Sequence, residues 1–234
     1  MPDTPVLQPD LIDRLRADLD AAAYTVDRLR TLWGDSADDA LTRGDRVPAL
    51  RALGEATPAG TLARLFILGM PGRVADVEAA LPTLGASGAE RLGLLRADDD
   101  ALVPLVDLRP YSVVDASGVA AWWIVSDLGE IATGGELRTD HVLGVGGASA
   151  TLSGLQLPDP VDSILDLGTG CGIQALHASR FARRVVATDV SERALDFARF
   201  TAALNGIDSI EFRLGDMFAP VAGERFDRIV SNPP

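Results

Sequence analysis

A short apolar run that ends in a glycine-rich turn constrains the fold of this chain more than any other feature. Residues 163–168 read SILDLG and predict a buried strand, and the glycines at its end allow a sharp turn into a helix over 172–182. A second strand over 184–189 and a second helix over 191–206 repeat the same order. Strands that alternate with helices are typical of a parallel sheet in an α/β fold.

Two further strands are predicted at residues 210–216 and 226–234. The order from Val161 onward is therefore strand, helix, strand, helix, strand, strand, which is the opening of a doubly wound sheet. Ser191 is placed to cap the second helix and Gly206 to end it. Because ligands of such sheets bind at the carboxyl ends of the strands, the residues that follow each strand are the candidate site.

The glycine-rich turn alone leaves two kinds of ligand open. Gly168, Gly170 and Gly172 let a ligand lie against bare main chain, and such a turn before a helix could hold the pyrophosphate of a dinucleotide. Asp166 lies two residues before the first glycine, where it would face a phosphate unfavourably. An acid at this place suits instead a ligand that carries positive charge and no phosphate.

Four short motifs at strand ends resemble those of class I S-adenosylmethionine methyltransferases. They are Asp166-Leu-Gly-Thr-Gly-Cys-Gly172, Asp189, Gly215-Asp216 and Asn232-Pro233-Pro234, and they cover about the last third of the chain. The last motif is similar to the Asn-Pro-Pro-aromatic signature of amino-group methyltransferases, among them the release-factor glutamine N5-, rRNA guanine N2- and adenine N6-methyltransferases. The resemblance implies an enzyme with a Rossmann-like α/β sheet, of which the first four strands are present, and S-adenosylmethionine as cofactor.

The resemblance also implies which residues contact the cofactor. These residues are Asp166, Gly168, Thr169, Gly170, Gly172, Asp189, Val190, Asp216, Met217 and Asn232. S-adenosylmethionine carries an ammonium and a sulfonium but no phosphate, so an acidic site suits it. The Asp189 carboxylate is expected to accept both ribose hydroxyls, and Asp216 to accept from the adenine amino group, with Met217 against the ring.

The motif Asn232-Pro233-Pro234 is the expected reacting end of the site, and all three residues are predicted to be catalytic. Methyl transfer to an amide or an aromatic amine is an in-line displacement, and the obstacle is the delocalised lone pair of the nitrogen. The resemblance implies that the Asn232 side-chain oxygen and the Pro233 carbonyl accept the two N–H bonds, which directs the nitrogen toward the methyl group. The prolines fix the direction of that carbonyl because their φ angle is locked.

Three other reactive side chains are given structural interpretations. Cys171 is expected to fill space within the glycine turn, and His177, in the middle of a helix, to be packed or solvent-facing rather than an acid or base. His141 lies in a Gly-rich segment and is not predicted to be catalytic. Because two His and one Cys are widely spaced, no metal site is predicted.

The first 115 residues are predicted to form a helical and winged-helix-like α+β accessory domain. Apolar residues recur every three or four positions over 10–34, which predicts one long helix that begins at Asp10 and ends at Gly34. Within 58–114, three short helices and a hairpin resemble a winged helix, a module that many class I methyltransferases carry before the catalytic domain. The expected recognition region, 82–91, holds a single Arg, and one cation is too few to neutralise several DNA phosphates.

The rest of the chain is divided at residue 157. Residues 116–157 are predicted to be a strand, over 119–128, and a Gly-rich connecting segment over 140–154. Residues 158–234 are predicted to be the N-terminal half of the methyltransferase domain.

The charge of the chain bears on its substrate. Its 234 residues carry a net charge of −13, and residues 1–157 hold 13 Arg against 23 Asp and Glu. An acidic domain disfavours binding to nucleic acid, because binding to a polyanion needs clustered cations. A protein glutamine, on a release factor or a ribosomal protein, is therefore the favoured substrate. An rRNA guanine N2- or adenine N6-methyltransferase is the alternative, and a non-catalytic winged-helix module that binds a partner or DNA is a third hypothesis.

The sequence ends at Pro234, before the aromatic residue and the later strands that the resemblance implies. We therefore expect a longer parent enzyme, and we expect these residues alone to be inactive and to associate through an open sheet edge. One Cys, no signal-peptide pattern and no long apolar run predict a cytoplasmic location without a membrane partner.

Overall fold

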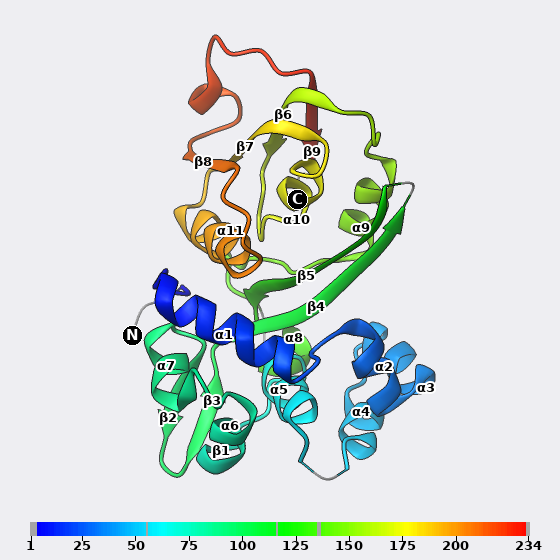
Figure 1. The fold of residues 1–234 in the computed structure, drawn as a ribbon, viewed down its shortest axis with the longest axis vertical. Coiled ribbons are helices and arrows are strands. Elements are labelled where there is room, and N and C mark those ends of the chain that lie inside the picture. Colours follow the sequence, from blue (N-terminus) through cyan, green and yellow to red (C-terminus); the bar gives the residue numbers. More distant parts are fainter. Residues whose placement is uncertain (1–3, 55, 116, 135–136, 233–234) are drawn as a thin grey trace. The chain divides into compact units, whose positions relative to one another are not determined.

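The computed structural model describes residues 4–54, 56–115, 117–134 and 137–232 (Figure 1). The chain divides into two compact units. The first comprises Met1–Ser112 with Asp127–Arg138, and the second comprises Val113–Ser126 with Thr139–Pro234. The boundaries that the sequence suggests after residues 115 and 157 stay a prediction. Among the described residues, no helix has the length and apolar character needed to cross a membrane.

The first unit is mainly helical. Its elements are α1 (Pro9–Ala21), α2 (Val26–Trp33), α3 (Asp35–Thr42), α4 (Val47–Ala52), α5 (Pro58–Phe66), β1 (Gly72–Arg73), α6 (Val74–Ala80), α7 (Gly85–Arg91), β2 (Leu95–Asp98), β3 (Ala101–Pro104), most of β4 (Val106–Asp115) and α8 (Glu130–Thr133). Strands β1, β3 and β2 form an antiparallel sheet in that order. Helices α5, α6 and α7 and this sheet follow the predicted order of three helices and a hairpin.

The single helix predicted over 10–34 is wrong, because the chain breaks between α1 and α2. Ala23 takes a left-handed conformation with φ 50°, and the Thr25 side chain accepts from the Arg28 N–H and so starts a new helix. Tyr24 is fully buried at this break, and its hydroxyl donates to the Leu108 carbonyl at 2.9 Å. The apolar periodicity continues through the break, which is why the sequence does not show it. The predicted end at Gly34 is confirmed.

The second unit is built on a parallel sheet. Its elements are β5 (Gly118–Asp127), α9 (Gly147–Leu155), β6 (Val161–Leu167), α10 (Ile173–Ala178), β7 (Ala182–Asp189), α11 (Glu192–Leu204), β8 (Ile210–Leu214), a 3-10 turn η1 (Ala219–Val221) and β9 (Arg228–Ser231). In the described part of the chain, the sheet order is β8-β7-β6-β9, and every neighbouring pair is parallel. The predicted doubly wound sheet is thus present over these strands (Figure 1).

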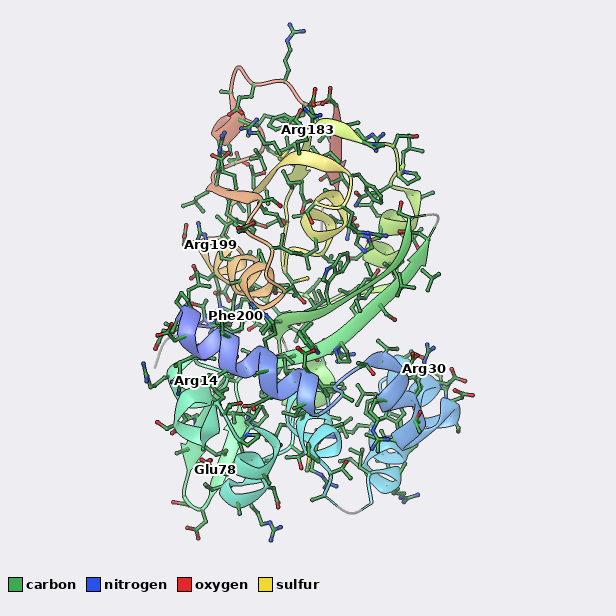
Figure 2. All side chains as sticks on the ribbon, viewed as in Figure 1. Arg14, Arg30, Glu78, Arg183, Arg199 and Phe200 are labelled. Carbon is green, nitrogen blue, oxygen red and sulfur yellow. The ribbon has the colours of Figure 1, made fainter. Side chains whose placement is uncertain are left out.

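Helix α11 shows how the sequence pattern positions a helix on this sheet. Ser191 caps it by accepting from the Ala194 N–H, and Gly206, with φ 68°, follows its end as predicted. Phe200 is fully buried, whereas its neighbour Arg199 pairs with Glu192 and Asp196 of the same helix; both residues are labelled in Figure 2. Helix α11 packs against β7 and β8, and its paired charges lie on a different face from its buried residues.

Strand β5, which the sequence predicts over 119–128, lies along α11. The Asn205 side chain accepts from the Trp123 N–H at 2.9 Å and donates to the Trp123 carbonyl at 2.8 Å. The Thr201 hydroxyl accepts from the Val125 N–H at 3.2 Å. Side chains of this helical segment therefore satisfy backbone groups that a neighbouring strand would otherwise pair with. The other edge of β5 pairs with β4 in a two-stranded sheet.

The Gly-rich segment predicted as a connection over 140–154 contains helix α9, which the sequence does not predict. The helix consists mostly of small residues and includes two glycines, which disfavour an isolated helix. Tertiary contacts stabilise it. The buried Gln174 side chain of α10 donates to the Ser149 carbonyl at 2.8 Å and accepts from the Gln156 side chain at 2.7 Å.

Candidate functional site

The predicted site residues lie at the carboxyl edge of the parallel sheet. In the strand register, Leu167 of β6 is opposite Thr188 of β7 and opposite Ser231 of β9. Asp189, the last residue of β7, is opposite Leu214 of β8. The glycine turn, Asp189, Asp216 and Asn232 therefore leave neighbouring strands at one edge. Strands β7 and β8 lie on one side of β6 and β9 on the other, so this edge contains the topological switch point at which doubly wound sheets bind ligands.

The glycine turn takes a conformation that favours glycine. Gly168, Gly170 and Gly172 have φ angles of 75°, 55° and 91°. A Cβ on Gly172 would lie 3.2 Å from the Cβ of Ala198, so this glycine allows the turn to approach α11. Cβ atoms on Gly168 and Gly170 would meet nothing within 4 Å. Main chain is thus exposed to open space at these two positions, as binding of a ligand against it requires.

Asp189 holds the turn in place. Its carboxylate accepts from the Gly170 N–H at 3.0 Å and from the Ser191 N–H at 2.9 Å, one bond to each oxygen. The side chain is half-buried. Each carboxylate oxygen can accept further hydrogen bonds, so Asp189 retains capacity for two ligand hydroxyls.

Asp166 lies beneath the turn and is fully buried. Its Oδ2 accepts from the Thr169 hydroxyl at 2.6 Å, whereas Oδ1 is buried and has no hydrogen-bond partner among the described residues. Burial raises the pKa of Asp166 to about 7, with a smaller contribution from the charge of Asp189, while the Thr169 hydroxyl and, more weakly, the Ala175 backbone N–H oppose that rise. An unpartnered buried carboxylate oxygen is costly, and a cationic ligand group would satisfy it.

The predicted adenine end of the site follows β7 and β8. Val190 and Met217 expose 72% and 60% of their surface, so both are accessible for contact with a flat ring. Met217 has φ 46°, a left-handed conformation that is rare outside glycine. Asp216, directly before it, is exposed.

Asn232 follows the last residue of β9. Its Nδ2 donates to the hydroxyl of Ser149 on α9 at 3.1 Å, and the side chain is half-buried. The preceding Ser231 hydroxyl donates to the Leu167 carbonyl at 2.8 Å, which ties the end of β9 to the residue before Gly168. Pro233 and Pro234, the other residues predicted to be catalytic, lie outside the described residues.

Two of the residues given structural interpretations are buried. Cys171 is buried in the turn. His177 is buried, with its ring edge-on to Trp122 at a centroid distance of 5.0 Å, and burial lowers its pKa to about 4. His141 is half-buried, and its role stays untested. In the part of the chain that the structure describes, no group of three or more His, Cys, Asp or Glu side chains is placed to hold a metal ion.

Sequence reasoning missed Ser149 and Gln174. Both contact elements of the site through side chains that no motif marks. Ser149 stands in a run of small residues without a recognisable pattern, and Gln174 is one polar residue in a helix. Nothing in the sequence indicates that α9 and α10 bring them together.

Comparison with known proteins agrees with this geometry. Residues 146–234 match a family model described as "Methyltransferase small domain". Residues 21–105 match one described as "Domain of unknown function (DUF7059)". The first match confirms, for that part of the chain, the resemblance to class I S-adenosylmethionine methyltransferases.

Three relatives show what this region is similar to. A release factor glutamine methyltransferase of Xylella fastidiosa (strain 9a5c) is 48% identical over 73 residues, which is 30% of this chain and 26% of the relative. A ribosomal protein uL3 glutamine methyltransferase of Bradyrhizobium diazoefficiens is 37% identical over 103 residues, 43% of this chain and 31% of the relative. A ribosomal protein L11 methyltransferase of Lactobacillus johnsonii is 42% identical over 71 residues, 30% of this chain and 22% of the relative. The match thus spans less than a third of each relative.

Proposed function

We propose that this chain is part of an enzyme that transfers a methyl group from S-adenosylmethionine to the side-chain amide nitrogen of a protein glutamine. The observation that carries the proposal is the placement of Asn232. It follows β9 beside the glycine turn, and its amide is held by a hydrogen bond from Nδ2 to Ser149. Two of the relatives named above are glutamine methyltransferases, which supports the choice of substrate.

The residues at the carboxyl edge fit the cofactor. The Asp166 carboxylate, buried beneath the turn, would attract the ammonium through its negative charge, and the open space over Gly168 and Gly170 would admit the chain that bears it. Asp189 has acceptor capacity for the ribose hydroxyls, and Val190 and Met217 offer apolar surface for the adenine. We propose these contacts together with those predicted for Thr169, Gly172, Asp216 and Asn232.

The chemistry that the cofactor supplies is an electrophilic methyl group on a sulfonium. The protein's own contribution is to orient the acceptor nitrogen. Because Nδ2 of Asn232 is bonded to Ser149, its Oδ1 is the atom left to accept an N–H of the substrate amide. The Pro233 carbonyl is proposed to accept the second N–H. Two acceptors in fixed positions aim the nitrogen and stabilise the positive charge that develops on it.

The accessory part of the chain is proposed to be winged-helix-like over residues 58–114, the range that the sequence predicts. The order α5, β1, α6, α7, β2, β3 and the sheet order β1-β3-β2 support this proposal. Helix α7 begins with small residues and ends at Arg91, so it has few positive charges with which to neutralise phosphates. We therefore propose that this part contacts a protein partner.

We also propose a cytoplasmic location. In addition, we propose that two copies associate through β9, because among the described strands β9 pairs with β6 alone.

The proposed function is tested with full-length protein and a radiolabelled methyl donor. Release factors, ribosomal proteins and protein-free rRNA are offered in separate reactions, and the labelled residue is identified by mass spectrometry. We expect label on a glutamine of a protein pool, and loss of label with Asn232→Ala. Label in rRNA alone would favour the base methyltransferase, and absence of both cofactor binding and label would favour the non-catalytic module.

A further inference from the structure

The contact between Ser149 and Asn232 joins two parts of the second unit that are far apart in sequence. Ser149 lies in the first turn of α9, whereas Asn232 follows β9, 83 positions later. The Asn232 Nδ2 donates to the Ser149 hydroxyl at 3.1 Å. A serine hydroxyl can both donate and accept, so it can bond either end of a side-chain amide, and the bond fixes where the Asn232 side chain lies rather than which end faces α9.

Ser149 is itself fixed by a network that begins at the glycine turn. Helix α10 starts directly after Gly172, and its Gln174 donates to the Ser149 carbonyl at 2.8 Å. The Ser153 hydroxyl donates to the same carbonyl, also at 2.8 Å. Gln174 is only 3% exposed, so its bonds to α9 are shielded from water. The turn, α10, α9 and Asn232 are thereby connected by consecutive hydrogen bonds.

The position of the Asn232 amide matters for the proposed reaction. With Nδ2 bonded to Ser149, Oδ1 is left as an acceptor for a substrate N–H. Displacement of the side chain from α9 would move Oδ1 away from that N–H and would weaken the interaction. Asn232 is half-buried and follows the end of a strand, so the strand alone does not fix the position of its side chain.

We propose that Ser149 is a positioning residue that holds the Asn232 side chain at its place beside α9, and that Gln174 holds Ser149 in place for this purpose. The proposal rests on the proposed function, because it assigns Ser149 a role in the same site. Ser149 acts through Asn232 and is not assigned a contact with the substrate. The expected consequence is that loss of the hydroxyl lowers kcat and leaves cofactor affinity unchanged.

The experiment compares three variants of the full-length protein. Ser149→Ala removes the hydroxyl, and Ser149→Thr restores it. Thr151→Ala is the matched control, because Thr151 is an exposed hydroxyl residue of the same helix that donates only to the Gly147 carbonyl, at 2.9 Å. For each variant we would measure kcat and KM for a glutamine substrate, and the Kd of S-adenosylmethionine by calorimetry. The side-chain NH₂ signal of Asn232 would be followed by ¹⁵N NMR and assigned with Asn232→Asp.

We expect Ser149→Ala to reduce kcat by about 10- to 100-fold, the range that misplacement of a catalytic group produces. It should also shift the Asn232 NH₂ signal, while Ser149→Thr and Thr151→Ala keep both properties near wild type. An unchanged kcat and an unchanged NMR signal in Ser149→Ala would overturn the inference. If the wild type transfers no methyl group but Ser149→Ala still shifts the signal, the proposed function fails while the positioning of Asn232 is supported.

Discussion

The buried carboxyl of Asp166 leads to a prediction about stability and pH. Its pKa rises from 3.8 to about 7, chiefly because burial disfavours the charged form. Between these two values the folded protein binds a proton that the unfolded chain has released. The free energy of unfolding should therefore fall as the pH rises from about 4 to 7, and this contribution should be constant above that range.

The magnitude follows from the difference between the two pKa values. At about 1.4 kcal/mol for each pKa unit, the ionised carboxyl lowers the stability of the ligand-free protein by roughly 4 kcal/mol at pH 8, as an upper bound. Asp166→Asn keeps the shape of the side chain and an oxygen that can accept from Thr169, but it cannot ionise. The variant should thus lose far less stability than the wild type between pH 5 and pH 8.

Urea denaturation at pH 5 and pH 8 measures this difference directly. Asp162→Asn is the control, since Asp162 is an exposed carboxylate on the same strand, with 83% of its side chain accessible. We expect the pH dependence of Asp162→Asn to match the wild type and that of Asp166→Asn to be smaller. If Asp166→Asn and the wild type lose equal stability over this range, the argument from burial is refuted.

Three further predictions concern single contacts. Asp189→Ala should weaken binding of S-adenosylmethionine by about 1–3 kcal/mol in calorimetry, because ribose hydroxyls would lose their acceptor, and unchanged affinity would exclude the ribose assignment. Gly172→Ala should destabilise the fold by about 1–3 kcal/mol in chemical denaturation, because φ 91° is strained for alanine, and wild-type stability would show that the turn can relax. Asn205→Ala should cost about 1–3 kcal/mol by removing both bonds to Trp123, whereas Asp208→Ala, at an exposed neighbour, should not; equal stability of the two variants would contradict the docking of β5.

The sequence by itself determined the core of the second unit. Apolar runs that end in glycine or acid predicted β6 and β7, because parallel strands buried on both faces read as continuous apolar segments. The more polar segments 210–216 and 226–234 were predicted as the next two strands, which are β8 and β9. Ser191 and Gly206 marked the ends of α11, because helix caps depend on residues close in sequence. The order of these elements then placed Asp189, Asp216 and Asn232 at one edge of the sheet.

The tertiary structure decided what depends on distant neighbours. The break before Thr25 is stabilised by Tyr24, whose hydroxyl bonds to Leu108, so the apolar period of the helix could not reveal it. The segment at α9 is a poor helix former, and it folds because Gln174 of α10 bonds to it. The sequence placed Asp166 at the mouth of the site, but only the packed structure shows that its carboxyl is buried beneath the turn. The bond between Ser149 and Asn232 likewise spans 83 positions. Local spacing specifies strands, turns and caps, whereas burial and side-chain pairing arise only when separate elements pack together.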